Sequence, residues 1–305
     1  MRLGIDLGGT KIEIVALDGS REILRERVPT PRSGYADTIR AMRDLVLAAN
    51  DRLGRHGTVG VAIPGTISTR TSLVKNANST QLIGHPLDRD LTEAIGRPVR
   101  VANDANCFAV SEASDGAAAG ADVVFGVIVG TGCGGGISVR GRVLTGAHGI
   151  AGEWGHNPLP RPTDEEFATA PACYCGRKGC IEAWISGTGL AADFKRRTGR
   201  ALFGPDIAAA AAQGDASAKA TMEDFYDRFA RSLASIVNVL DPDAIVLGGG
   251  LSNIDILYDE LPRRVEACAF TPEGPTRIVK AKHGDSSGVR GAAWLWSEKE
   301  AFEAT

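Results

Sequence analysis

Two segments of the chain place alternating apolar residues on either side of a glycine turn. The first covers residues 3–17, with Gly8 and Gly9 at its centre, and the second covers residues 123–139, with glycines between 130 and 136. Glycine tolerates the positive φ that a tight hairpin needs, so each segment predicts a strand, a turn and a second strand. The recurrence of this unit predicts an internal duplication.

Further periodic segments follow each glycine turn. Apolar residues at helical spacing predict helices, and short β-rich runs predict strands between them. An alanine run at 208–212 predicts one face of a helix, and residues 161–170 predict an irregular loop. The expected helices cover residues 35–53, 105–118, 216–240 and 254–267, and the expected strands cover residues 59–63, 99–102 and 244–247. This alternation predicts an α/β protein with two similar lobes.

The boundary between the lobes is expected at residues 116–120, where small residues end one helix before the second glycine turn. This division gives an N-terminal lobe over residues 1–118 and a C-terminal lobe over residues 119–287. A C-terminal helix over residues 288–302 is expected to complete the N-terminal lobe. The cleft between two such lobes is the expected ligand site.

Composition excludes several classes of partner. A net charge of −3 and the lack of a Lys/Arg run argue against nucleic acid. The N-terminal apolar run is interrupted at once by Asp6, and no stretch approaches the ~20 apolar residues of a membrane span. We therefore expect no membrane partner and a cytoplasmic protein. Cys107, Cys133 and Cys268 are expected to be ordinary core residues in this reducing compartment.

Three of the six cysteines lie close together in the run C-Y-C-G-R-K-G-C. Cys173, Cys175 and Cys180 would supply three thiolates, and His156 a short distance upstream would supply an imidazole. These four donors satisfy a tetrahedral zinc ion. The alternative is three free cysteines in a loop.

Two acidic residues flank this ligand set. Glu153 stands three positions before His156, and Glu182 stands two positions after Cys180. A metal that fixes the loop would therefore place two carboxylates and an imidazole beside one another. We interpret the zinc loop as the scaffold of a pocket for a polar substrate.

The glycine turns are suited to phosphate. Glycine lets several backbone N–H groups approach a phosphate with no Cβ in the way, and a Thr hydroxyl or Lys ammonium adds donors. The runs 8–11 and 130–132 both combine glycines with such a donor. A third glycine cluster, at 248–250, follows an expected strand. Asp6 could hold a hydrated Mg²⁺ against the same phosphates. Singly these glycines are turn residues, but together they predict a nucleotide site between the lobes.

Asn103 and Asp104 follow the expected strand 99–102 and precede a helix. Asp104 could be no more than the N-cap of that helix, a role that aspartate favours. A carboxylate at the carboxyl end of a strand could also be a general base that takes a proton from a sugar hydroxyl. Asn103 could then hydrogen-bond another hydroxyl.

Together these motifs resemble the ROK family of sugar kinases and repressors, over essentially the whole chain. The resemblance rests on D-L-G-G-T-K at 6–11, A-N-D-A-N at 102–106, G-E-W-G-H at 152–156, the cysteine run through Glu182, L-G-G-G at 247–250 and S-G-V-R-G-A-A at 287–293. V-K-N-A-N-S-T at 74–80, G-E-W-G-H-N-P-L-P at 152–160 and the run 280–296 are most similar to bacterial manno(fructo)kinases. The family implies an actin-like ATPase (ribonuclease H-like) fold, duplicated and two-lobed, with an interlobe cleft, and a homodimer.

The resemblance also implies roles for individual residues. Asp104 would be the catalytic base, and His156 would bind zinc through one ring nitrogen and face the sugar with the other. The implied sugar-binding residues are Asn78, Asn103, Asp104, Glu153, His156 and Glu182. The implied nucleotide-binding residues are Asp6, Gly8, Gly9, Thr10, Lys11, Thr131, Gly132, Cys133 and Gly134, with Gly248, Gly249 and Gly250 bordering the adenosine.

Our hypothesis is an ATP-dependent hexose kinase that phosphorylates the 6-hydroxyl of fructose, and also accepts mannose, with Mg²⁺ and a structural Zn²⁺. The alternatives are a kinase for glucose or an N-acetylated hexosamine, a sugar-sensing regulator without turnover, and a purely structural zinc protein. Family glucokinases carry Pro-Asn-Leu followed by Trp where this chain has A-N-S-T at 77–80, which disfavours glucose. Family repressors carry a helix-turn-helix ahead of the first strand, where this chain begins, which disfavours a repressor.

Overall fold

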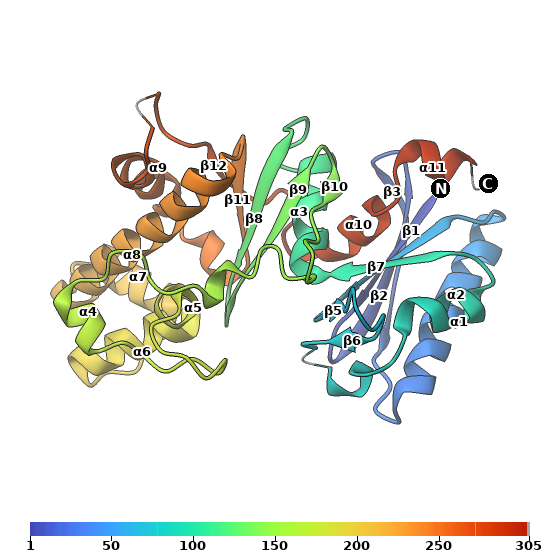
Figure 1. Cartoon of the computed structure of the whole chain (residues 1–305), viewed down its shortest axis with the longest axis horizontal. Coiled ribbons are helices and arrows are strands. Elements are labelled where there is room, and N and C mark those ends of the chain that lie inside the picture. Colours follow the sequence, from blue (N-terminus) through green and yellow to red (C-terminus); the bar gives the residue numbers. More distant parts are fainter. Residues whose placement is uncertain (78, 272, 304–305) are drawn as a thin grey trace. The chain divides into compact units, whose positions relative to one another are not determined.

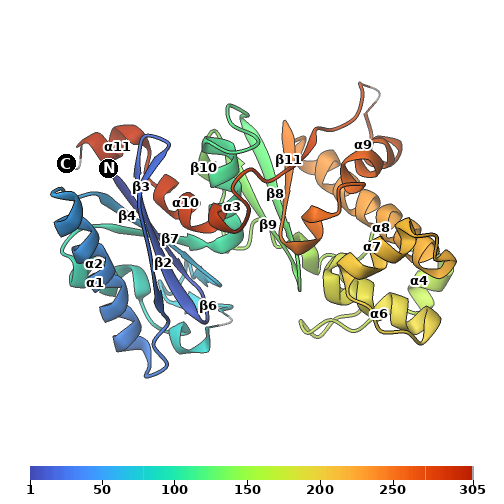
Figure 2. The same ribbon diagram turned by 180° about the vertical axis from the view of Figure 1, so that it is seen from behind.

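The computed structural model describes residues 1–77, 79–271 and 273–303. It divides into two compact units, drawn from two sides in Figures 1 and 2. Unit 1 contains Met1–Gly120, Gly136–Ala151 and Asp285–Thr305, and unit 2 contains Ala121–Gly135 and Gly152–Gly284. The N-terminal and C-terminal segments of the chain therefore belong to the same unit.

The central sheet of unit 1 consists of β1 (Arg2–Leu7), β2 (Lys11–Asp18), β3 (Arg21–Pro29), β4 (Thr58–Ile63) and β7 (Val99–Asn103). These strands lie in the order β3-β2-β1-β4-β7 (Figure 1). Strand β1 pairs antiparallel with β2 and parallel with β4, and β4 pairs parallel with β7. The carboxyl ends of β1, β4 and β7 therefore meet at one edge of the sheet.

A second five-stranded sheet consists of β8 (Val123–Val129), β9 (Cys133–Val139), β10 (Arg142–Val143), β11 (Ala244–Gly248) and β12 (Ile278–Lys280). Its order, β10-β9-β8-β11-β12, repeats that of the first sheet, with β11 parallel to both β8 and β12. A small hairpin pairs β5 (Thr66–Ile67) with β6 (Val74–Lys75). The repeated order confirms the predicted duplication and the α/β class.

The helices of unit 1 lie on both faces of its sheet. Figures 1 and 2 show α1 (Tyr35–Leu53) and α2 (Leu87–Ile95) on one face, with α10 (Ser287–Trp294) on the other. Helix α3 (Asp104–Ser114) packs against α10. Helix α11 (Glu298–Glu303) follows α10 near the end of the chain. Short 3₁₀ turns add η1 (Thr80–Leu82) and η4 (Gly284–Ser286).

Alternation along β1 explains this arrangement. Leu3 and Ile5 are fully buried in the apolar cluster that includes Met42 of α1. Gly4 points to the opposite face, where a Cβ would lie 2.1 Å from the carbonyl oxygen of Val289 in α10. Helix α10 thus lies directly on the strand backbone, which only glycine permits.

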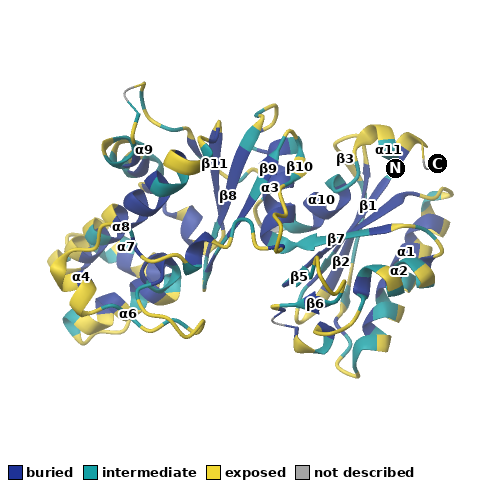
Figure 3. Cartoon of the chain, viewed as in Figure 1, coloured by how far each residue is buried: buried dark blue, intermediate teal, exposed yellow. Residues whose placement is uncertain are grey.

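The helices of unit 2 are α4 (Asp164–Ala168), α5 (Ile181–Ile185), α6 (Gly187–Thr198), α7 (Gly204–Ala212), α8 (Ala216–Leu240) and α9 (Leu257–Cys268), with 3₁₀ turns η2 (Trp154–His156) and η3 (Gly250–Asn253). The long helix α8 packs against α5, α6, α7 and α9. Figure 3 shows that its inner side is buried while the outer sides of α4 and α6 are exposed. Within the described residues, no helix is both long and apolar enough to cross a membrane.

The predicted helices 35–53 and 216–240 coincide with α1 and α8, and the predicted strands all exist within one residue. The predicted loop 161–170 is wrong in part, because Thr163 and Glu166 form a capping box that starts α4. The predicted helix 288–302 is broken, because Ser297 bonds the Glu300 side chain and separates α10 from α11. Both errors concern helices too short to show a clear helical spacing of their apolar residues.

The helix predicted over 105–118 ends earlier, at Ser114, where the chain turns through Gly116. A Cβ on Gly116 would lie 2.5 Å from the Cα atom of Glu112, so only glycine allows this turn. Among the cysteines expected in the core, Cys107 and Cys133 are buried, whereas Cys268 is half-buried.

The close packing of α10 makes a testable prediction. In Gly291→Ala the new methyl would lie 1.7 Å from the carbonyl oxygen of Cys107 in α3, so the two helices must separate. We expect a loss of about 1–3 kcal/mol in the free energy of unfolding. Gly9→Ala is the control, because its methyl would meet no atom within 4 Å. Thermal unfolding of both variants measures the difference, and equal melting temperatures would contradict the packing described.

Candidate active site

Four predicted metal ligands lie together in unit 2. His156 ends η2, Cys173 and Cys175 lie in the following loop, and Cys180 precedes α5. Their ligand atoms all lie within 4.8 Å of one another. The structure therefore brings together the complete donor set that the sequence predicts.

The spacing of these donors fits zinc. The Sγ atoms of Cys175 and Cys180 are 3.6 Å apart, and Nδ1 of His156 is 3.6 Å from Sγ of Cys173. In a tetrahedral zinc site two sulfurs lie about 3.8 Å apart, and a nitrogen and a sulfur about 3.6 Å apart. A disulfide would need about 2.05 Å. The cluster is thus preformed for a metal rather than for a disulfide.

The other ring nitrogen of His156 faces Tyr174. Nε2 lies 3.0 Å from the Tyr174 hydroxyl, and the two rings meet edge to face. Tyr174 is 83% exposed. Partial burial of the hydroxyl itself, followed by the negative charges of Glu182, Cys173 and Glu153, raises its pKa. Sequence reasoning missed Tyr174, although its place between two metal ligands was a usable signal.

Glu182 contacts the second glycine turn. Its Oε2 accepts a 2.8 Å hydrogen bond from the backbone N–H of Cys133, and a Cβ on Gly132 would lie only 2.7 Å from the same oxygen. A side chain at position 132 would therefore displace this carboxylate from its place against the turn. The sequence assigned Glu182 to the sugar and this turn to the nucleotide, and the structure places the two in direct contact.

A buried tryptophan anchors Glu153 and His156. Trp154 is 3% exposed, stacks on Phe229, and donates through Nε1 to the carbonyl oxygen of Gly134 at 3.2 Å. Glu153 precedes it and is exposed, while His156 follows two residues later. In the motif G-E-W-G-H, a carboxylate thus precedes the buried tryptophan and an imidazole follows it.

Two of the predicted nucleotide-binding turns lie together in unit 2. A Cβ on Gly130 would be 3.8 Å from the backbone nitrogen of Gly250, and Gly248 pairs with Ile128 of β8. Gly249 has φ +83 and follows the buried Gly248, whereas Thr131 and Gly250 are exposed. The backbone N–H groups of both turns belong to one loop cluster, as a nucleotide site needs.

The start of α6 supports this loop cluster, which sequence reasoning missed. The Gly187 N–H donates to the Gly130 carbonyl at 2.7 Å, and the Thr188 hydroxyl donates to the Thr131 carbonyl at 2.7 Å. The run S-G-T-G at 186–189 was the available signal.

The first glycine turn, in unit 1, is a hairpin between β1 and β2. The Gly8 N–H donates to the Lys11 carbonyl at 3.0 Å, and the Thr30 hydroxyl donates to the Gly8 carbonyl at 2.7 Å. Gly9 and Thr10 at its tip are exposed. The Lys11 ammonium lies 3.6 Å from Glu13 and stays half exposed, so it keeps donors for a phosphate.

Asp6 lies near the carboxyl end of β1, just before this turn. Burial, followed by the negative charge of Asp104 and of Glu13, raises the pKa of Asp6 to about 6. Carboxylate oxygens such as those of Asp6 and Asp104 are the donors that Mg²⁺ prefers. The residues present therefore fit the predicted magnesium site.

Asp104 is the first residue of α3, at the carboxyl end of β7. Asn103, not Asp104, is the N-cap: its Oδ1 accepts from the Ala105 N–H at 2.9 Å, which corrects the capping alternative. Oδ1 of Asp104 accepts from the same N–H at 2.8 Å. Burial raises the pKa of Asp104, and the hydrogen bonds from Ala105 and Asn103 oppose this shift.

The structure thus assembles two groups of predicted residues. Unit 1 combines Asp6, the first glycine turn, Asn103 and Asp104, and unit 2 combines the zinc ligands, Glu153, Glu182 and the other glycine turns. Asn78, a predicted sugar ligand, lies outside the described residues. Chemically, one group offers a base and a metal site, and the other offers hydrogen-bonding groups for a polyol.

Comparison with known proteins identifies the family of this chain. The family model "ROK family" matches residues 2–299. The N-acetyl-D-glucosamine kinase of Yersinia pseudotuberculosis is 43% identical over 299 residues, covering 97% of this chain and 98% of that protein. The N-acetyl-D-glucosamine kinase of Vibrio cholerae is 42% identical over 301 residues, covering 97% and 99%.

Solved structures agree. The ROK hexokinase from Thermus thermophilus superposes with a TM-score of 0.85 at 33% identity, covering 96% of this chain and 97% of that chain. The ROK family glucokinase from Streptomyces griseus, solved with glucose and AMPPNP, gives a TM-score of 0.73 at 28% identity, covering 96% and 98%. The predicted actin-like ATPase fold is thereby confirmed. The chain belongs to the ROK family, and within it this protein is an ATP-dependent sugar kinase.

Proposed function

We propose that this kinase transfers the γ-phosphoryl group of ATP to the 6-hydroxyl of N-acetyl-D-glucosamine. The observation that carries this choice is the 40–43% identity to kinases named for that sugar, over at least 97% of the chain. The N-acetylated hexosamine was an alternative to fructose in the sequence analysis, and the relatives favour the alternative. Fructose becomes the second candidate, supported by the motifs at 74–80 and 280–296.

Asp104 is proposed as the general base. Its position at the carboxyl end of β7 leaves the carboxylate partly accessible, and its raised pKa makes it a better proton acceptor than an ordinary aspartate. It would take the proton of the attacking hydroxyl while Lys11 and the glycine-turn N–H groups stabilise the phosphates. Mg²⁺, when bound, neutralises charge on the transferring group, and Asp6 would help to hold it.

The sugar is proposed to bind Glu153, His156 and Glu182, together with Asn103. Zinc held by His156, Cys173, Cys175 and Cys180 would fix the orientation of the imidazole, so that Nε2 points to the sugar. Tyr174, which now contacts Nε2, would have to share or yield that position. The predicted homodimer and cytoplasmic location stay predictions.

A panel of sugars tests the substrate. We expect the highest kcat/KM for N-acetyl-D-glucosamine in a coupled assay of ADP formation, with fructose and mannose at least tenfold lower, because a site that hydrogen-bonds an acetamido group leaves buried groups unpaired with other hexoses. A higher kcat/KM for fructose than for N-acetyl-D-glucosamine would favour our first hypothesis, that fructose is the substrate.

Replacing the base tests Asp104. Asp104→Asn should lower kcat by about 10²–10⁴-fold with little change in sugar KM. Because burial raises the pKa of Asp104, the ionised carboxylate costs stability above that pKa, and the amide variant should melt no lower than the wild type at pH 8. Asp44→Asn, on the exposed side of α1, is the control and should retain kcat. Unchanged turnover in Asp104→Asn would remove this residue from the role.

Metal analysis tests the zinc site. The purified chain should contain about one zinc ion per chain, and Cys175→Ser should lose it, because three donors hold zinc less tightly than four. Cys175 is exposed, so the change disturbs no core packing. Cys268→Ser, a half-buried cysteine of α9, is the control and should keep the ion. Elemental analysis decides the matter, and full zinc content in Cys175→Ser would exclude the proposed ligand set.

A further inference from the structure

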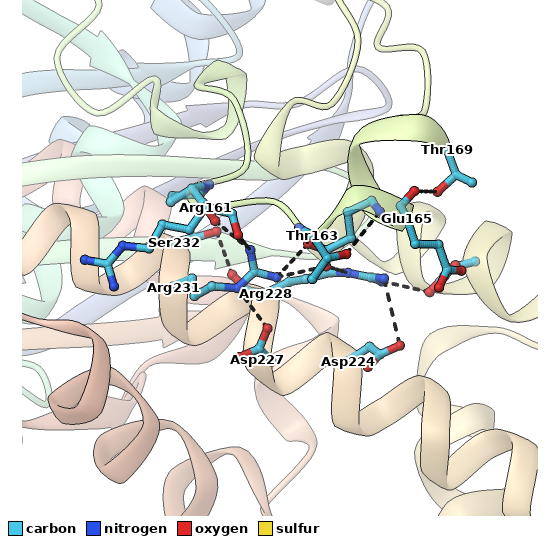
Figure 4. Close-up of polar contacts among 12 residues, drawn as sticks. Arg161, Thr163, Glu165, Thr169, Asp224, Asp227, Arg228, Arg231 and Ser232 are labelled. Carbon is cyan, nitrogen blue, oxygen red and sulfur yellow. Dashed lines mark hydrogen bonds and ion pairs between the residues drawn. The ribbon is translucent and has the colours of Figure 1, made fainter.

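Two buried arginines lie one turn apart on α8, and their side chains contact the segment 160–166 (Figure 4). Arg228 is 3% exposed and Arg231 is 8% exposed. Their acidic partners, Glu166 of α4 and Asp193 of α6, are equally buried. This set of four residues is called the arginine cluster below.

Arg231 holds the chain between His156 and Cys173. Its Nη1 donates to the carbonyl oxygens of Pro160 and Arg161 at 2.6 and 2.8 Å, and its Nη2 donates to both oxygens of Glu166 at 2.8 and 3.0 Å. Arg161 has φ +47, a conformation that non-glycine residues rarely adopt. One guanidinium thus fixes both a strained turn and the short helix that follows it.

Arg228 reaches the other side of the ligand set. It donates to Glu166 and to Asp193 at 2.7 Å each, and its guanidinium lies 4.4 Å from the ring centre of Trp184. Trp184 belongs to α5, two residues after Glu182 and four after Cys180. The same arginine therefore contacts the helix that follows the last zinc ligand.

Apolar packing contributes little to the position of this segment. Between residues 157 and 172 only Leu159 and Glu166 are buried, and Phe167 is 78% exposed. A five-residue helix has no stability of its own in water. Backbone hydrogen bonds pair the two ends of the segment with residues 178–181. Its middle part is held by the polar contacts of the arginine cluster and by the cap of Thr163 on Glu166.

Because its charges are buried, the arginine cluster contributes more to the position of the segment 157–172 than to the free energy of unfolding. Removing two ion pairs from water costs several kcal/mol per ion. Proteins in which apolar residues of similar volume replace a buried ion pair are often equally stable. Although burial alone would raise it, hydrogen bonds from Arg228, Thr163 and Arg231 hold the pKa of Glu166 below its usual value, so the pair stays ionised. The directional bonds of both guanidinium groups to Glu166, and of Arg231 to the 160–161 carbonyls, define the position of this segment.

We propose that Arg228 and Arg231 are positioning residues of the active site, which fix the chain on both sides of the zinc ligands and thereby set the affinity for sugar. They touch neither metal nor substrate, and act through Glu166, the 160–161 carbonyls and Trp184. The sugar-affinity part of this inference rests on the proposed function, whereas the zinc and backbone parts do not.

Arg231→Lys tests the inference, because an ammonium keeps the charge but cannot serve both carbonyls and Glu166 together. Arg264→Lys is the matched control: Arg264 bonds Glu223 and Glu260 across α8 and α9, away from the zinc ligands. We expect Arg231→Lys to raise the sugar KM about tenfold, leave the ATP KM within about twofold and release zinc to a chelator about tenfold faster. Arg264→Lys should match the wild type in all three.

Hydrogen exchange on the wild type provides a test that needs no variant. Peptides from 160–169 should exchange slowly in the zinc-bound protein and stay protected after chelation, because the arginine cluster does not depend on the metal. In Arg231→Lys the same peptides should exchange faster.

Wild-type zinc release and sugar KM in a folded Arg231→Lys variant would overturn the inference, as would unprotected 160–169 peptides in the wild type. If N-acetyl-D-glucosamine is not the substrate, the zinc and exchange measurements still decide the matter.

Discussion

The segment from Glu153 to Glu182 has too little apolar surface to hold itself in place, and this constraint shapes unit 2. Its fixed points include the buried Trp154 side chain, four donors within 4.8 Å of one another, backbone bridges to Lys178 and Cys180, and two buried arginines of α8. Apart from Trp154, these are a candidate metal site and directional hydrogen bonds. The proposed sugar-binding groups of this segment thus depend on geometry that a loosely packed loop could not maintain.

Unit 1, in contrast, holds its functional residues in place by apolar packing. Gly4 of β1 and Gly60 of β4 allow α10 to lie directly on the sheet, and this sheet carries Asp6 and Asp104 at the carboxyl ends of β1 and β7. Because both carboxyls are partly buried, their pKa values are raised. A rigid scaffold can maintain such costly groups, since the surrounding core offsets their desolvation.

Long, regular patterns were predictable from the sequence. Helices α1 and α8, the glycine hairpins and the duplication follow from local periodicity, and the four zinc donors follow from spacing alone. Helix α4 was missed, because five residues carry no period and its signal was a capping box. Capping of α3 was an alternative role for Asp104, but Asn103 is the cap, since either residue type can take that position.

The sequence by itself determined the chemistry of this protein: its donors, its glycine turns and its acids are local motifs, each legible in a few consecutive residues. Only the tertiary structure decided which of them meet. Glu182 reaches Cys133 across 49 positions, Tyr174 turns to His156, and Arg231 reaches back to Pro160 across 71 positions. Such contacts depend on how distant elements pack together, and no local pattern records that packing.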